Sequence, residues 1–326
     1  MNKVERLKAT IVGEEVDRPP IALWRHWPVD DQDPSTLARA TVEFQRRYDF
    51  DFIKVTPASS FCIRDWGATD CWEGHFHGTR TYGDRVVGDI SDWSRIVPRS
   101  PYEGHLAKQL EVLELIRDQV DDQRVPVIQT IFSPLSQAKN LVGQEALLQH
   151  LRQAPEEVEK ALQNILIATQ DFVNAAIKLG IDGIFYAVQF AQPQLLTSGE
   201  YDRFGRSYDL PILANARGGW LNVLHLHGAP VYFDKFVDYP VQVINWHDRE
   251  TYPSLAQGLE MFPGAVCGGI SQTEVLTLGN PQQVSAQVSD ALDQTGGRRL
   301  IIGTGCVTPT TAPVGNLYAA RSAVEM

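Results

Sequence analysis

The sequence predicts an α/β protein that folds as a single (β/α)8 barrel. Eight apolar, strand-like runs recur along the 326 residues, and most are followed by a helical stretch. Alternation of this kind implies parallel strands covered by helices, and eight such units over about 300 residues fit a closed barrel. A doubly wound open sheet is the alternative, but it would need a glycine-rich phosphate-binding loop after an early strand, and the sequence has none there. We expect the strands near residues 20, 51, 125, 182, 220, 240, 264 and 299.

Helix start and stop residues justify the elements between these strands. Val4, Leu7 and Ile11 lie at helical spacing and predict an N-terminal helix, which the proline-containing segment 17–20 ends. Pro155 and the two glutamates after it favour the start of another helix, because proline and acidic residues suit a first turn. The same reasoning predicts helices at about 34–47, 104–120, 143–153, 155–179, 198–214, 231–237, 251–262, 281–296 and 313–326.

Residues 58–100 break this alternation. The run WEGHFHGTRTYGDRVVG, residues 72–88, alternates and is rich in Gly, Thr and aromatic residues, which predicts a β-hairpin excursion after the second strand. It holds His75 and His77, with Cys71 four residues before His75. We interpret the pair as part of a solvated or substrate-covering hairpin, in preference to a metal site, because so short a motif has weak specificity.

Composition limits the classes of function. The formal net charge of −11 argues against nucleic acid as the main partner, but it leaves room for a small anion in a local basic pocket. No apolar run reaches the roughly 18 residues of a membrane span, and the charged N-terminus lacks the pattern of a signal peptide. Four cysteines in a chain of this length do not form a disulfide framework. We therefore expect one soluble cytoplasmic domain, residues 1–326, with a homodimer as a candidate assembly.

Polar and reactive residues gather where the predicted strands end. In barrels of this class the chemistry lies at the carboxyl ends of the strands and in the loops that follow. We take Arg25, Tyr186 and Asp248 as candidate catalytic residues. For Arg25 the alternatives are binding of a substrate anion and a salt bridge on the rim; for Asp248 they are a metal ligand, a partner of a histidine, and a helix cap. The candidate substrate-binding residues are Arg25, His26, Lys54, Phe132, Gln189 and His247.

Two histidines and a cysteine suggest a metal site. The stretch VLHLHGAP, residues 223–230, ends the fifth strand, and His225 and His227 point the same way because side chains alternate along a strand. Cys306 follows the eighth strand in IIGTGCVTP, across the barrel from the fifth. Two imidazoles, one thiolate and an open position make a zinc site; the alternative is a pair of hydrogen-bonded core histidines. Cys62 and Cys267 are interpreted as small apolar residues.

Several of these segments resemble the uroporphyrinogen decarboxylase superfamily, and the resemblance covers nearly the whole chain. It implies a (β/α)8 barrel with its active site in the mouth. The matching stretches are VERLKATIVGEEVDRPPIALWR at the start, IFSPLSQAKNLVG after the third strand, LGIDGIFYA leading to LLTSGEY, VLHLHG at the fifth strand, a GGIS strand end, and GTGCVTPTTAPVGNLYAA at the close.

The resemblance implies two alternative chemistries. The decarboxylases proper use no metal; they bind porphyrinogen carboxylates with arginines after strand one, and use an aspartate after strand two and a histidine in the final turn. Here Arg25 matches, but a second arginine and the aspartate are absent, and Cys306 stands in the final turn. The zinc-dependent cobalamin:thiol methyltransferases carry H-x-C on strand five and a cysteine in the final turn. His225 and Cys306 match this motif, whereas His227 stands in place of its first cysteine.

Replacing a thiolate by a neutral imidazole leaves the metal centre one unit more positive, which makes the zinc a stronger Lewis acid. We therefore expect zinc-dependent methyl transfer that involves a corrinoid, or a corrinoid-bearing partner protein, and a small anionic acceptor. The alternatives are metal-free decarboxylation of a porphyrinogen and a non-catalytic barrel that binds a corrinoid or another ligand.

Overall fold

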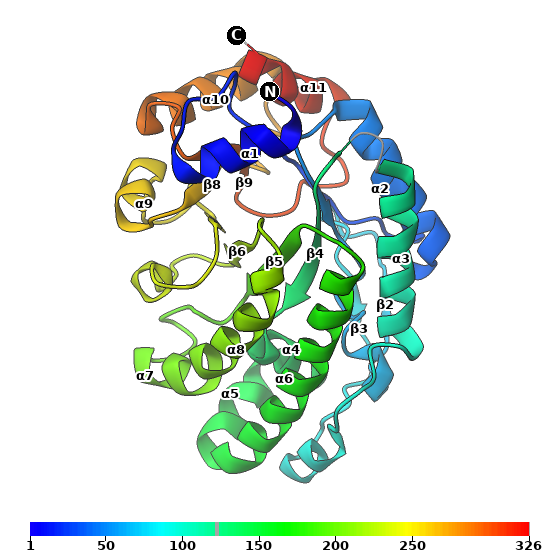
Figure 1. Cartoon of the computed structure of the whole chain (residues 1–326). Coiled ribbons are helices and arrows are strands. Elements are labelled where there is room, and N and C mark those ends of the chain that lie inside the picture. The colour runs from blue at the N-terminus through cyan, green and yellow to red at the C-terminus, as the bar shows by residue number, and fades with distance from the viewer. Residues whose placement is uncertain (121–123, 326) are drawn as a thin grey trace.

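The computed structural model describes residues 1–120 and 124–325 and contains a curled sheet of seven parallel strands (Figure 1). Neighbours in the sheet follow each other along the chain, as in a barrel, so the prediction of a (β/α)8-type fold is confirmed. The strands, in sheet order, are β1 (Ile53–Val55), β4 (Val127–Phe132), β5 (Gly183–Val188), β6 (Val223–Leu226), β7 (Val243–Trp246), β8 (Ala265–Ile270) and β9 (Leu300–Thr304).

The strand predicted near residue 20 is reduced to a single bridge. Ile21 forms an isolated parallel bridge with Ile302 of β9, and the Ala22 amide donates to the Ile302 carbonyl at 3.0 Å. On the other side, the Asp51 amide donates to the Ile21 carbonyl at 2.8 Å. Segment 20–22 therefore lies between β9 and the approach to β1 and closes the barrel without forming a full strand.

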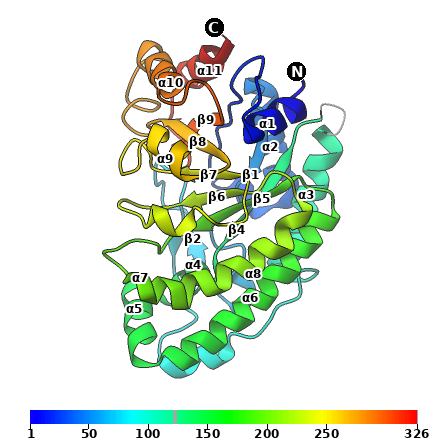
Figure 2. The ribbon, with the colours of Figure 1, turned by 60° about the vertical axis from the view of Figure 1, so that its left-hand side comes forward.

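The helices cover the outside of the sheet, and Figure 2 shows the strands between α10 and α11 on one side and α6 and α8 on the other. They are α1 (Lys3–Val12), α2 (Pro34–Tyr48), α3 (Gly104–Val120), α4 (Pro134–Val142), α5 (Gln144–Gln153), α6 (Pro155–Lys178), α7 (Ser198–Tyr201), α8 (Ser207–Asn215), α9 (Leu255–Met261), α10 (Pro281–Thr295) and α11 (Val314–Ser322). Shorter helical turns are η1 (Asp30–Gln32), η2 (Arg64–Trp66), η3 (Ile90–Arg95), η5 (Asp202–Arg206), η6 (Ala216–Gly218), η7 (Phe233–Phe236) and η8 (Ala323–Glu325).

Most predicted helices are present, with three differences. Helix α4 was not predicted; Ser133 caps it by accepting from the Ser136 amide, and Pro134 occupies its first turn. The helix predicted at about 198–214 is divided into α7, the π-helical turn η5 and α8. The helix predicted at about 231–237 is only the short turn η7. Residue 326, the predicted end of the last helix, lies outside the described residues.

The barrel interior is filled from one end by apolar side chains at alternate strand positions. Leu7 of α1 packs against this inner cluster, so the N-terminal helix closes that end of the barrel. Alternation then points the next inward residues of each strand toward the opposite end, where the carboxyl ends of the strands lie. The strand residues of the cluster are Ile128, Phe185, Val223, Val243, Ala265, Cys267 and Ile301, and Ala22 and Phe52 occupy matching positions just outside the strands.

The excursion after β1 contains a short hairpin, as predicted, in which β2 (Asp70–Cys71) pairs antiparallel with β3 (Thr81–Tyr82). Its tip is attached to the turn that follows β9, because the amide and the hydroxyl of Thr310 both donate to the Phe76 carbonyl, at 2.7 and 2.8 Å. Gly78 is packed so closely there that a Cβ would lie 2.7 Å from the Cβ of His26. The tip of the hairpin is thus held against the rim of the barrel.

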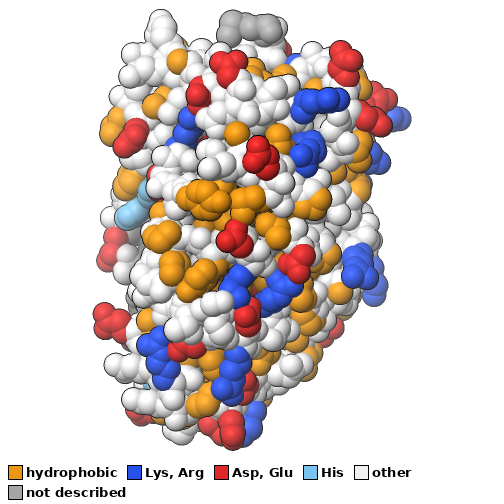
Figure 3. Space-filling model, turned by 90° about the vertical axis from the view of Figure 1, so that its left-hand side faces the viewer, with side chains coloured by type: hydrophobic (Ala, Val, Ile, Leu, Met, Phe, Trp, Pro, Cys, Tyr) orange, Lys and Arg blue, Asp and Glu red, His pale blue; other side chains and the backbone are white. Residues whose placement is uncertain are grey.

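The surface carries charges of both signs. On the face drawn in Figure 3, acidic and basic side chains are interspersed, and hydrophobic side chains gather near its middle. Within residues 1–120 and 124–325, none of the helices combines the length and the apolar character that crossing a membrane requires.

Candidate metal centre

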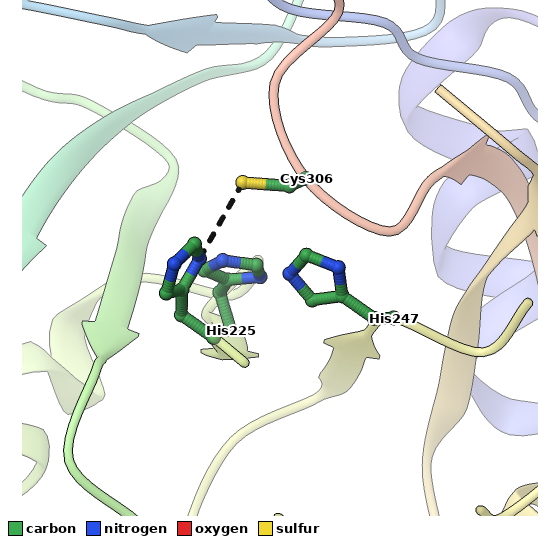
Figure 4. A group of neighbouring side chains, drawn as sticks. His225, His247 and Cys306 are labelled. Carbon is green, nitrogen blue, oxygen red and sulfur yellow. Dashed lines mark hydrogen bonds between the residues drawn. The ribbon is translucent and has the colours of Figure 1, made fainter. Parts of the chain in front are cut away.

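Three histidines and a cysteine converge at the carboxyl ends of the strands. One potential ligand atom from each of His225, His227, His247 and Cys306 lies within 4.8 Å of those of the others. His225 is on β6, His227 directly follows it, His247 directly follows β7, and Cys306 is in the turn after β9. Figure 4 shows His225, His247 and Cys306 pointing into the same space.

Contacts within the cluster are close. Cys306 Sγ lies 3.7 Å from His227 Nδ1, the contact dashed in Figure 4. The ring centroids of His227 and His247 are 5.2 Å apart, and those of His225 and His247 are 6.1 Å apart. Imidazole nitrogen and thiolate sulfur are ligands that zinc takes, so the donor set suits that metal.

The hydrogen bond of His225 fixes which ring nitrogen is free. Asn245 donates its side-chain amide to the carbonyls of Cys267 and Thr304, at 2.9 and 3.0 Å. Its oxygen is therefore left to accept, and His225 Nδ1 lies 2.7 Å from that oxygen. Nδ1 must carry the proton, so Nε2 has a free lone pair. Partners of this kind orient metal-binding histidines in known metal sites.

His247 is oriented in a similar way. Its Nδ1 lies 3.2 Å from Glu250 Oε2, and Gln272 donates to the other oxygen of that carboxylate at 3.1 Å. The opposite ring nitrogen of His247, Nε2, is buried without a hydrogen-bond partner. A buried nitrogen with an unused lone pair is costly unless a ligand supplies the missing interaction, which is what a metal would do here.

Burial keeps the three histidines neutral. It lowers the pKa of His225 well below its usual value, and the neighbouring His227 and His247 lower it further. Burial also lowers the pKa of His247. Burial, followed by the neighbouring His247, lowers the pKa of His227 to about 3. Neutral imidazole is the form that binds metals. The Cys306 thiol behaves oppositely, because burial raises its pKa, and a bound cation would favour the thiolate.

The cluster opens into a cavity of about 260 Å³ in the mouth of the barrel. Aromatic side chains form part of its lining, and one of them, Tyr82, comes from strand β3 of the hairpin. Gln189 lines the cavity, and its side-chain oxygen is buried without a partner. The lining residues are Trp24, His26, Lys54, Thr56, Pro57, Ser59, Thr79, Arg80, Tyr82, Thr130, Phe132, Lys139, Asn140, Phe185, Ala187, Gln189, His225, His227, Cys306 and Val307.

Four of the predicted substrate-binding residues line this cavity: His26, Lys54, Phe132 and Gln189. A larger hollow of about 660 Å³ lies elsewhere, between segment 14–19 and the end of α10, and it contains none of the cluster residues. Because the reactive groups converge in the smaller cavity, we place the candidate site there.

The three residues predicted to be catalytic do not face this cavity. Tyr186 is on the outer face of β5, and its hydroxyl donates to the buried carboxylate of Asp209 at 2.6 Å. Arg25 also points away from the barrel interior, where its guanidinium lies 4.9 Å from the Trp27 ring centroid. Each residue is one position out of register with the inward-facing residues of its segment, so neither side chain enters the cavity. Their catalytic roles stay predictions.

Asp248 connects the loop after β7 to strand β8 and lies outside the cluster. The Gly269 amide donates to its Oδ2 at 3.1 Å, and burial raises its pKa to about 7. It is not a helix cap, because Ser254 caps α9. Its carboxylate is held against the end of β8, and its catalytic role stays a prediction.

His247 is predicted from the sequence only as a substrate-binding residue. Its place beside His225 and its contact with Glu250 are not predicted. The position of His247, two residues after Asn245 on an inward-facing register, could have placed it beside His225. Glu250 and Lys139 carry no comparable pattern, because one lies in a loop and the other on the helix that was not predicted.

Comparisons with known proteins agree with this fold. A family model described as uroporphyrinogen decarboxylase (URO-D) matches residues 2–326. No curated protein matches the chain in sequence.

Among solved structures, the chain is similar to a methyltransferase from Methanosarcina mazei, with a TM-score of 0.87 and 19% identity over 100% of this chain and 98% of that one. It is also similar to a B12-independent methionine synthase from Shewanella sp. W3-18-1, solved in complex with selenomethionine. There the TM-score is 0.60 and the identity 14%, over 97% of this chain and 95% of the other. At these identities the likeness shows a shared fold.

Proposed function

Because the chain belongs to the uroporphyrinogen decarboxylase family, a family of enzymes, we propose that it is the zinc-dependent methyltransferase type of member. It would move a methyl group from a corrinoid, free or on a partner protein, to a small acceptor in the barrel mouth. The observation that carries this proposal is the convergence of three histidines and Cys306 within 4.8 Å. A bound zinc would supply Lewis acidity, polarising the acceptor atom that approaches it.

Different residues of the chain would have different roles at the metal. His225, His227, His247 and Cys306 would hold the metal, while Asn245 and Glu250 hold two of the imidazoles in position. The acceptor would take the place of one of these four side chains at the metal. His247 is the ligand that we expect to give way, because its carboxylate partner Glu250 is partly solvent-exposed, whereas the Asn245 that holds His225 is fully buried.

Cavity size weighs against the porphyrinogen alternative. A volume of about 260 Å³ falls below the range of about 300–1,000 Å³ that is typical of sites for drug-sized ligands. A tetrapyrrole is larger than such ligands. The acceptor is accordingly a compact molecule, and the corrinoid would present its methyl group from outside the cavity.

Metal content tests the proposal directly. The full chain, purified without chelators, should contain about one zinc by elemental analysis. His227→Ala should lose it, whereas His75→Ala, in the exposed part of the hairpin, should keep it. With zinc bound, the chain should demethylate methylcobalamin in the presence of small thiol or oxygen acceptors. The change in the visible absorbance of methylcobalamin measures this reaction. A native chain that contains no zinc and takes up none when zinc is added would refute the proposal.

A further inference from the structure

Basic side chains line the cavity beside the cluster. Three basic residues line it, Lys54, Lys139 and Arg80, and none of the described residues that line it is Asp or Glu. This contrasts with the formal net charge of −11 on the whole chain. A basic lining in an acidic protein selects for negative charge in the ligand.

Arg80 does not contribute free charge. Its Nε donates to Asp70 at 2.5 Å, and its Nη1 donates to Asp31 at 3.2 Å. Both carboxylate side chains are fully buried, so the guanidinium is neutralised behind the cavity wall. The two lysines are left as the sources of unbalanced charge.

Neither lysine has a carboxylate within 4 Å among the residues that the structure describes. Lys54 is buried on β1; its ammonium donates to the Thr56 hydroxyl at 3.3 Å and lies 4.6 Å from the Phe185 ring centroid. Lys139 lies on α4, next to Asn140, whose carbonyl accepts from Arg85 at 2.7 Å. Burial lowers the pKa of Lys54 to about 7 and that of Lys139 to about 8. An incoming anion would stabilise the charged ammonium form of each lysine.

The two lysines act electrostatically on different members of the cluster. Burial raises the pKa of Cys306, and the charge of Lys54 opposes this shift. Burial and His247 lower the pKa of His227, and the charge of Lys139 adds to that shift. Both lysines also line the same cavity as Cys306 and His227, so an anion bound between them would lie next to the candidate metal centre.

We propose that Lys54 and Lys139 form an anion clamp, which binds the carboxylate, sulfonate or phosphate group of a small acceptor whose nucleophilic end lies at the cluster. The inference rests on the proposed function and narrows its substrate to a compact bifunctional anion. The two lysines together set the preference for an anion, and Arg25, which points away from the cavity, has no part in it.

Two thiols of equal length test the clamp. Isothermal titration calorimetry on the zinc-loaded full chain compares 3-mercaptopropionate with the neutral 3-mercapto-1-propanol. We expect the carboxylate to bind about 10-fold more tightly, the effect of one hydrogen bond between charged groups. In Lys139→Met this preference should fall to about 2-fold or less, with the affinity for the alcohol unchanged. The matched control Lys178→Met, at an exposed position on α6, should keep the native preference.

The outcomes separate the two proposals. A chain that binds zinc but binds both thiols equally, or neither, refutes the clamp and leaves the metal centre standing. A chain that takes up no zinc refutes the proposed function; the same two thiols are then titrated into the metal-free chain, where equal or absent binding also refutes the clamp. Thermal unfolding checks that Lys139→Met is folded, and Lys54→Met, which should reduce the same preference, provides a second variant.

Discussion

Two buried polar clusters lie on opposite faces of the barrel strands, and they differ in how well their groups are satisfied. On the outer face, the Asp209 carboxylate accepts from the hydroxyls of Tyr186, Tyr201 and Tyr239, at 2.6, 2.5 and 3.0 Å. On the inner face, His247 Nε2 and the Gln189 side-chain oxygen are buried without partners. A satisfied cluster stabilises a fold, whereas unpartnered groups around a cavity indicate a site that a ligand completes.

The largest expected effect is on the outer cluster. Asp209→Ala should lower the free energy of unfolding by about 4 kcal/mol, because it leaves three buried hydroxyls without their acceptor. Chemical denaturation at pH 5 measures the loss. Zinc content per folded chain should be unchanged; a loss of zinc in a folded variant would contradict the separation of the two clusters.

A pH series should show the same carboxylate titrating. Burial raises the pKa of Asp209 from 3.8 to about 6, although the three hydroxyls oppose the shift. The folded state therefore holds the proton more tightly than the unfolded state, and this group's contribution to stability falls as pH rises from about 4 to 6, by roughly 3 kcal/mol.

The histidines of the inner cluster have the opposite effect on the free energy of unfolding. Because their pKa values are lowered in the folded state, their contribution to stability increases as pH rises toward 6.5. Comparison with Asp209→Asn isolates the aspartate. The difference in unfolding free energy between native and variant should change across pH 4 to 6, and a constant difference would contradict the assignment.

On the inner face, Glu250→Gln should weaken zinc binding by about 10-fold, because the amide is a poorer partner for His247 Nδ1. Competition with a chromophoric chelator measures the affinity. The control is Glu260→Gln, an exposed glutamate on α9. An unchanged affinity in Glu250→Gln would remove His247 from the set of ligands.

The smallest effects are expected where the sequence analysis placed catalysis. Tyr186→Phe should cost about 1 kcal/mol of stability, for one lost hydrogen bond, and should leave the turnover rate of the folded enzyme within about 2-fold. Arg25→Ala should change the affinity for 3-mercaptopropionate by less than about 2-fold. A 10-fold loss in either measurement would return that residue to the site.

The fold could be predicted from the sequence because apolar residues recur at the characteristic spacings of strands and helices. The sequence could also predict that His225, His227 and Cys306 meet, because the register of one strand and the order of strands in a barrel determine their positions. The same register, applied to Arg25 and Tyr186, would have turned them outward. The contacts of Glu250 and Lys139 depend on a loop and on α4. They could not be predicted, because no periodic pattern of residues marks them in the sequence.

The attachment of the hairpin tip to the final turn links the entrance of the cavity to the metal centre. Thr310, whose amide and hydroxyl hold the Phe76 carbonyl, is only four residues beyond Cys306. Gly78 is packed against both Thr310 and His26, so the tip has no room to shift inward. Any outward movement of the tip must break these bonds or pull on the turn that carries the thiol. Movement of the hairpin tip and the position of the Cys306 thiol are therefore coupled through this turn.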